Sequence, residues 1–159
     1  MPNHGQSKRC DKFIPFCALA LPLAAAALGS AAAGAADVMP NACPVDGCEV
    51  RIVEVKPSGS ELELTLEANF TPDVSKNHIH VWWGERYTVQ QAGRGAMPVY
   101  GVEKGAWHRH DDYPTYVTQG AASTSERADT VQLCVSAADR DHYILDVEVY
   151  HCVDVGEHL

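Results

Sequence analysis

The feature of this sequence that most restricts its fold is a two-residue alternation between residues 61 and 70. Leu62, Leu64 and Leu66 alternate there with polar side chains. Because successive side chains of a β-strand point to opposite faces, this spacing predicts a strand with one apolar and one polar face. The apolar face of such a strand has to be buried against a second layer, which favours a two-layer β protein.

Other segments carry the same signal, and each is bounded by Gly, Pro, Asp or Ser residues typical of turns. Strands are expected at residues 49–56, 78–83, 115–118, 130–137 and 142–155, with a short one near 99–102. No segment after the N-terminal region shows a convincing helical period. The sequence therefore predicts an all-β fold, an antiparallel immunoglobulin-like β-sandwich of short strands.

The N-terminal region has the three zones of a secretory signal peptide. Basic residues precede a nearly continuous apolar run from Phe13 to Leu28, and small residues follow up to Ala36. We expect a helical signal peptide at residues 1–36 and a single domain at 37–159. The alternative is a membrane anchor, since residues 13–36 are long enough to span a bilayer. Pro15 and Pro22 weaken that alternative.

The charge of the chain restricts its partners. The whole sequence has 12 basic and 21 acidic residues, and the expected domain alone has a net charge of about −11 with histidine neutral. Such a charge repels nucleic acid and anionic lipid surfaces, so neither nucleic acid nor a membrane is expected as partner of the mature form. It suits a soluble secreted or periplasmic protein that could attract cations.

Four cysteines remain after the expected cleavage, and an even number in an oxidising compartment predicts two disulfides. Cys43 and Cys48 are separated by a turn-forming tetrad, while Cys134 and Cys152 lie on polar faces of two neighbouring strands. The favoured pairing is therefore Cys43 with Cys48 and Cys134 with Cys152. A crossed pairing that ties the N-terminal strand to the C-terminal hairpin is the alternative.

A histidine pair gives the main functional signal. His78 and His80 are two residues apart in an expected strand, so both imidazoles lie on one face and can converge on one metal ion. Neutral imidazole is a good ligand for copper and zinc. The plainer interpretation is a strand face whose histidines make ordinary hydrogen bonds.

Two further places add candidate ligands. The polar loop at residues 108–112 contains His108 and His110 beside two aspartates, and His142 follows Asp141 in the last expected turn. A sandwich could bring all three places to one end, which would make a transition-metal site of copper or zinc. His151 alternates with apolar residues, and we interpret it as structural.

Three short motifs, found between residues 77 and 155, resemble parts of small exported bacterial domains of unknown function. The motifs are His78-x-His80-Val81-x-Trp83, Thr130-Val131-x-Leu133-Cys134-Val135 and Asp141-His142. The resemblance implies an immunoglobulin-type sandwich and an extracytoplasmic location. It implies no activity.

No motif of a known reaction is present: the sequence has no G-x-S-x-G, H-E-x-x-H or phosphate-binding glycine loop. We therefore expect a binding protein rather than an enzyme. Its partner is a metal ion or an unknown protein. A metal-free interaction domain would use the face of Trp82 and the aromatic region of Tyr113 and Tyr116. A metal-dependent enzyme is the third alternative.

Overall fold

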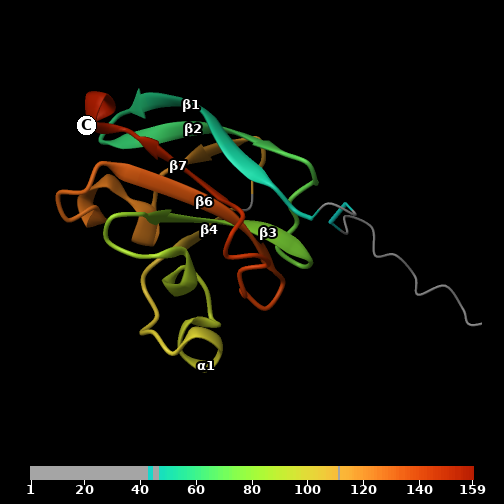
Figure 1. Ribbon diagram of the computed structural model, residues 1–159. Helices are drawn as coiled ribbons and strands as arrows, with labels where there is room; N and C mark the ends of the chain where they lie inside the picture. The colour runs from blue at the N-terminus through green and yellow to red at the C-terminus, as the bar shows by residue number, and fades with distance from the viewer. Residues whose placement is uncertain (1–42, 45–46, 111) are drawn as a thin grey trace, which may run out of the picture. The chain divides into compact units, whose positions relative to one another are not determined.

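The structure is a computed structural model that describes residues 43–44, 47–110 and 112–159 (Figure 1). The expected signal peptide and Asp111 of the polar loop lie outside the described residues. The described part is mostly β, with seven strands in two antiparallel sheets and one α-helix. The prediction of an all-β class is therefore confirmed.

The first sheet consists of β1 (Val50–Ser58), β2 (Glu61–Ala68) and β5 (Thr115–Val117), in the order β1-β2-β5. The alternation that starts at Glu61 is realised in β2, whose leucines are buried while the residues between them are partly or fully exposed. The register of β1 on β2 shifts between Ile52 and Glu54, where Val53 is 54% exposed.

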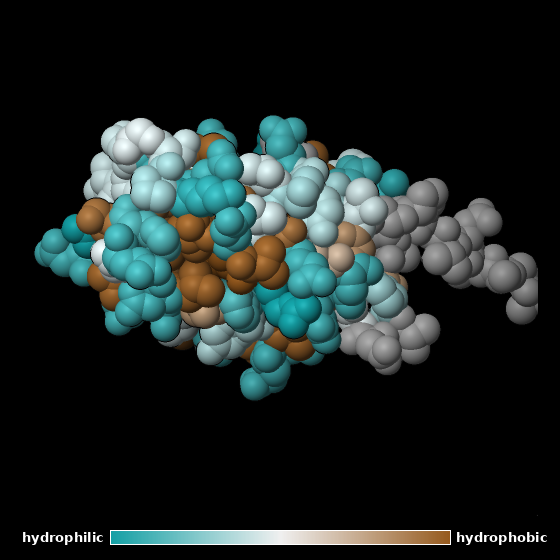
Figure 2. All heavy atoms as spheres, turned by 90° about the horizontal axis from the view of Figure 1, so that it is seen from above, coloured by the Kyte–Doolittle hydropathy of each residue, from teal (hydrophilic) through white to brown (hydrophobic). Residues whose placement is uncertain are grey.

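The outer face of this sheet is directed upward in Figure 1. Figure 2 looks down on that side and shows apolar side chains gathered in a small area with hydrophilic residues around them. The exposed apolar residues of these strands are Val53 and Val117, at 54% and 39%. A small apolar patch of this kind is normal for a protein surface, so it does not define an interface.

The second sheet consists of β4 (His108–His110), β3 (Asn77–Trp83), β6 (Gln132–Asp139) and β7 (Tyr150–Asp154), in the order β4-β3-β6-β7. β3 therefore lies in the middle, with β4 on one side and β6 on the other. Six of its seven residues are buried, so both of its faces are covered.

The main core lies between the two sheets. It contains the alternate apolar residues of four strands, namely Leu62, Leu64 and Leu66 of β2, Ile79, Val81 and Trp83 of β3, Leu133, Val135 and Ala137 of β6, and Val50 and Ile52 of β1. Burying a large apolar side chain contributes about 1.5–3 kcal/mol before chain entropy is counted. This core fixes which face of β3 points inward, and so which face carries His78 and His80 outward.

The outer face of the second sheet is covered by residues 84–107, which connect β3 to β4 and which we call the covering segment. This segment contains η1 (Val89–Gln91) and α1 (Ala96–Tyr100), and lies on the side of the sheet away from β1 and β2 (Figure 1). A second apolar cluster fills the space beneath it, formed by Trp82, Val89, Ala92, Cys134, Ala138 and Ile144.

Two expectations from the sequence fail in the structure. The short strand near 99–102 does not form: α1 ends there, and Gly101 closes it with a φ of 69°. Trp82 is 1% exposed beneath the segment, and Tyr116 is 2% exposed in the main core. Trp82 and Tyr116 therefore cannot contribute to the aromatic interaction surface that the sequence suggested, whereas Tyr113 is 36% exposed.

The last expected strand is shorter than predicted. Only Tyr150–Asp154 forms a strand, and residues 140–149 make turns. Asp139 explains part of this, because its carboxylate accepts the backbone N–H groups of Asp141 and Tyr143 at 2.8 and 3.0 Å. Side-chain bonds of this kind compete with the hydrogen bonds of a sheet. Leu145, expected on an apolar face, is 43% exposed.

Three short helical turns complete the elements: η2 (Gly120–Ala122), η3 (Thr124–Glu126) and η4 (Gly156–His158). Both favoured disulfides are formed, Cys43 with Cys48 and Cys134 with Cys152. The second joins directly opposed residues of β6 and β7. Two disulfides indicate an oxidising, non-cytoplasmic compartment. Within the described residues, no helix combines the length and the apolar character needed to cross a bilayer.

Candidate metal centre

Two of the three residues of the site come from the outward face of β3. His78 lies opposite Ala138 of β6, and His80 lies opposite Ser136. Directly opposed residues of antiparallel strands share a face, and these neighbours are small, so they leave room for two imidazole rings. Both histidines are fully buried beneath the covering segment.

The third residue is His142, at the tip of the turn after β6. The turn is closed by its own backbone, since His142 donates its N–H to Asp139 O at 3.0 Å. His142 has a φ of 70°, in the left-handed region that is uncommon for residues other than glycine. A strained backbone of this kind is typical of functional positions. The turn brings His142 above β3, although 64 residues separate it from His78.

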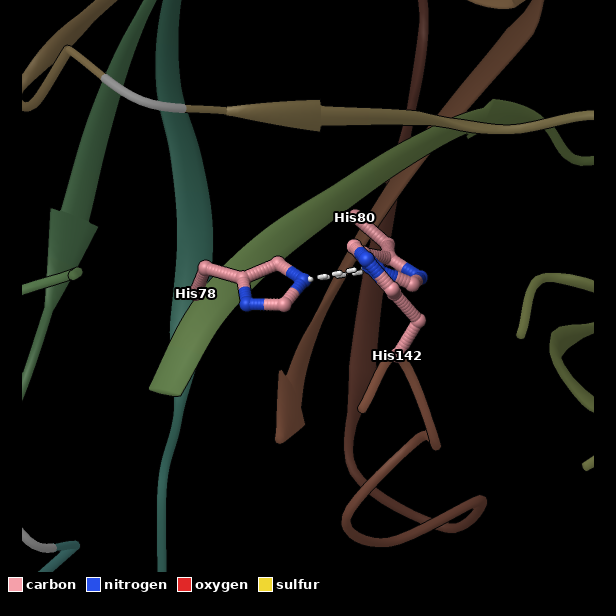
Figure 3. A group of neighbouring side chains, drawn as sticks. All are labelled: His78, His80 and His142. Carbon is pink, nitrogen blue, oxygen red and sulfur yellow. Dashed lines mark hydrogen bonds between the residues drawn. The ribbon is translucent and has the colours of Figure 1, made fainter. Parts of the chain in front are cut away.

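The three side chains converge on one point (Figure 3). His78 Nε2 lies 3.0 Å from His80 Nε2 and 3.0 Å from His142 Nδ1, and the last two nitrogens are 3.3 Å apart. We call these three residues the histidine triad. They offer three ring nitrogens at the corners of a nearly equilateral triangle.

The tautomer of His80 is fixed by the covering segment. His80 Nδ1 lies 2.6 Å from Ala92 O, and a carbonyl oxygen can only accept a hydrogen bond. The neutral ring therefore carries its proton on Nδ1 and directs the lone pair of Nε2 into the triad. Fixing a ligand by a hydrogen bond on its other nitrogen is the usual arrangement around metal-binding histidines.

Hydrogen bonds among the three ring nitrogens cannot satisfy all three pairs at once. With a lone pair on His80 Nε2, any neutral tautomers of His78 and His142 leave either two lone pairs or two N–H groups facing each other. A single cation can accept all three lone pairs at once. The arrangement thus suits a metal ion better than it suits three mutually bonded imidazoles.

The spacing of the nitrogens also fits a transition metal. Zinc–imidazole bonds are about 2.0–2.1 Å long, and nitrogens 3.0–3.3 Å apart are close enough for one ion to be held by all three residues. Three ligands on one side leave a coordination position on the other side, as in catalytic three-histidine zinc sites.

The surroundings of His80 and His142 favour their neutral forms. Burial lowers the pKa of His80 well below its ordinary value, against the opposing effect of its bond to Ala92 O, and the neighbouring His78 and His142 lower it further. Burial also lowers the pKa of His142, as do the positive charges of nearby arginines. Metals bind neutral imidazole, so the site is ready to bind a metal at neutral pH.

Trp107 forms one wall of the site. Its ring stacks on His80 with centroids 3.7 Å apart and planes inclined by 13°, and its centroid lies 5.1 Å from that of His142. The stacking holds the His80 ring in one orientation. Gly93 forms another close contact, because a Cβ there would lie 2.9 Å from His142 O. The covering segment therefore positions two of the three ligands.

The other predicted ligands lie elsewhere. His108 pairs with Val81 and His110 with Ile79, so both side chains are on the core side of the sheet, opposite to His80. His108 Nδ1 lies 3.0 Å from the Tyr116 hydroxyl, and the His110 ring packs edge-on against the ring of Tyr116. The structure does not bring His108 and His110 together with the other histidines, because residues 108–110 form a strand whose alternation turns these imidazoles inward.

His151 behaves as the sequence suggested. Its Nδ1 accepts the backbone N–H of Ile52 at 3.2 Å and links the two sheets. Sequence reasoning missed Ala92, Gly93 and Trp107. Ala92 acts through its backbone carbonyl, which no side-chain pattern reveals, and Trp107 had the aromatic character of a ring-stacking residue without a signal of its position.

Comparison of the chain with models of known protein families, with curated proteins and with solved structures finds no match in any of the three. The fold and the site together define a disulfide-bonded, two-sheet β protein with a buried histidine triad that could hold a metal ion. Within the described residues, this triad is the group of side chains suited to such a role.

Proposed function

We propose that this protein is an exported metal-binding protein whose ligands are His78 Nε2, His80 Nε2 and His142 Nδ1. The observation that carries the proposal is the triangle of ring nitrogens 3.0–3.3 Å apart. The hydrogen bond from His80 Nδ1 to Ala92 O supports it, because that bond directs a lone pair into the triangle.

The donor set favours copper or zinc. Imidazole suits both metals, and divalent copper binds most tightly in the series of first-row ions. The four cysteines of the described residues are in disulfides, so they supply no thiolate. Three neutral nitrogens are a poor match for magnesium or calcium, which prefer oxygen ligands.

The finer classification of the fold belongs to the same proposal. The orders β1-β2-β5 and β4-β3-β6-β7 support an immunoglobulin-like sandwich, in which β1, β2 and β5 would take the places of strands A, B and E. Residues 1–36 would act as the signal peptide, and the protein would be secreted or periplasmic. The resemblance to small exported bacterial domains agrees with this, since its His-x-His and Asp-His motifs contain the three proposed ligands.

The test is calorimetry of Cu²⁺ and Zn²⁺ binding to the purified, metal-free protein. We expect one ion per chain. The His78→Ala/His80→Ala double variant should lose this binding, and His142→Asn should weaken it strongly. Asparagine tolerates the left-handed backbone at residue 142, so the second variant keeps the fold while it removes a ligand. Circular dichroism checks that both variants are folded.

His158→Ala is the matched control. His158 lies in η4, where its Nε2 is 3.3 Å from a carboxylate oxygen of Glu157. Its removal should leave metal binding unchanged. The proposal fails if the double variant, shown to be folded, binds Cu²⁺ and Zn²⁺ as tightly as the unmodified protein.

A further inference from the structure

Three positively charged side chains border the histidine triad, although the chain as a whole has a formal net charge of −9. They are Arg94 and Lys104 of the covering segment and Arg109 of β4, and all three residues are exposed to solvent. Each of them is bonded to, paired opposite or packed against a residue of the site.

The backbone explains why these cations gather here. Arg94 donates its N–H to His142 O at 2.9 Å, so it is bonded directly to the turn that carries the third ligand. Arg109 lies opposite His80 on the neighbouring strand, and therefore on the same face of the sheet. Lys104 Nζ lies 5.1 Å from the ring centroid of Trp107, whose other contacts are His80 and His142.

Within the described residues, Arg94 and Lys104 form no ion pair with a carboxylate. The acids nearest to His142 in the turn have other partners: Asp139 accepts two backbone N–H groups, and Asp141 lies 3.5 Å from Arg140. Two cations without an ion-pair partner among the described residues, Arg94 and Lys104, therefore lie at the border of the site.

A bound metal ion would add to the positive charge at the site. Three neutral imidazoles leave the two positive charges of Cu²⁺ or Zn²⁺ uncompensated, and the bordering cations add to them. A site with this charge and a remaining coordination position attracts a negatively charged ligand, since opposite charges at a partly buried site interact strongly. A neutral or cationic ligand would gain nothing from Arg94 and Lys104.

We infer that the metal of the histidine triad takes a small anion as its exchangeable ligand, and that Arg94 and Lys104 attract this anion. The inference rests on the proposed function, because the triad must hold a metal for the anion to bind it. It names the class of ligand: a small inorganic anion or a carboxylate, bound through one atom to the metal.

Azide is a suitable probe, because its binding to Cu²⁺ gives a charge-transfer absorption that is absent from azide alone. The purified protein is loaded with one equivalent of Cu²⁺ and titrated with azide at low ionic strength. We expect a saturable absorption change. The Arg94→Gln/Lys104→Gln variant should raise the Kd for azide about two- to five-fold for each charge removed, the size expected for solvent-exposed charges beside a partly screened site.

The matched control is Arg51→Gln/Lys56→Gln. It removes the same two kinds of charge from β1, in the other sheet, where they pair with Glu67 and Glu54. The azide Kd of this variant should equal that of the unmodified protein. If both double variants change the Kd equally, the bordering charges have no special role and the inference is wrong.

Two other outcomes are also decisive, and they differ. A protein that binds Cu²⁺ but shows no azide absorption has no exchangeable position, which overturns the inference and leaves the metal site intact. A protein that does not bind Cu²⁺ at all overturns the proposed function, and the inference with it. Electron paramagnetic resonance of bound Cu²⁺ separates these two outcomes before azide is added.

Discussion

Replacing Gly93 with alanine should weaken metal binding without removing any ligand. Gly93 lies in the covering segment, directly against the turn that carries His142. A Cβ added there would lie 2.9 Å from His142 O, 3.1 Å from Ile144 Cγ1 and 3.2 Å from Ile144 N. Two of these three atoms belong to backbone, so the conflict cannot be relieved by a rotamer change alone.

The size of the effect follows from these distances. Normal contact requires the turn to move away by a few tenths of an ångström, and it carries His142 Nδ1 with it. Metal–ligand distances in a well-formed site vary by only about 0.2 Å. We therefore expect a loss of affinity of about 10-fold, the lower end of the effect of changing the support of a ligand. Overpacking should also cost about 1–3 kcal/mol of the free energy of unfolding.

The assay is a titration of Cu²⁺ into metal-free protein, with urea unfolding measured on the same samples. Gly101→Ala is the control. It has a φ of 69° and no atom within 4 Å of an added Cβ, so alanine should cost about 1–2 kcal/mol through backbone strain alone. Its metal affinity should not change. Equal affinities for Gly93→Ala and the unmodified protein, or equal losses in both variants, would refute the reasoning.

Three further predictions concern stability. Leu64→Ala should lower the free energy of unfolding by about 2–5 kcal/mol, because Leu64 is fully buried between the sheets; a loss below about 1 kcal/mol in urea unfolding would contradict this. Reducing the disulfides should lower the melting temperature by many degrees, since each bridge typically contributes about 2–4 kcal/mol, whereas EDTA should change it much less. Metal-free protein should lose stability as the pH falls below about 6.5, because unfolded histidine then binds a proton that burial denies to folded His80. Above that pH the contribution of His80 is complete, so urea unfolding at pH 7.5 and 5.5 should give the larger value at pH 7.5.

The sequence was sufficient for the features that depend on local alternation. The leucines of β2, the apolar residues of β3 and β6, and the shared face of His78 and His80 all follow from a period of two. The disulfide between Cys134 and Cys152 could be predicted for the same reason, because both residues lie on the outer faces of neighbouring strands. These properties need only the identity of neighbours along the chain.

The position of the site was decided by tertiary structure. His142 reaches His78 only because β6 pairs with β3 and because Asp139 closes the turn that follows. His108 and His110 have the same two-residue spacing as His78 and His80, yet the pairing of β4 with β3 turns them toward Tyr116. Spacing along the chain shows which residues share a face, but it does not show which face the sheet buries.

The covering segment is a second case in which the sequence does not show where a segment lies in the fold. Its sequence, rich in Gly and Pro, predicts loop and turn but not where the loop lies. In the structure it buries Trp82, fixes His80 through Ala92 O and stacks Trp107 on the same ring. The sequence by itself therefore determined most of the strands, the favoured disulfides and the shared face of His78 and His80. Tertiary structure decided the third ligand, the neutral state of the site and its positive border, because contacts, burial and charge proximity arise only between segments distant in sequence.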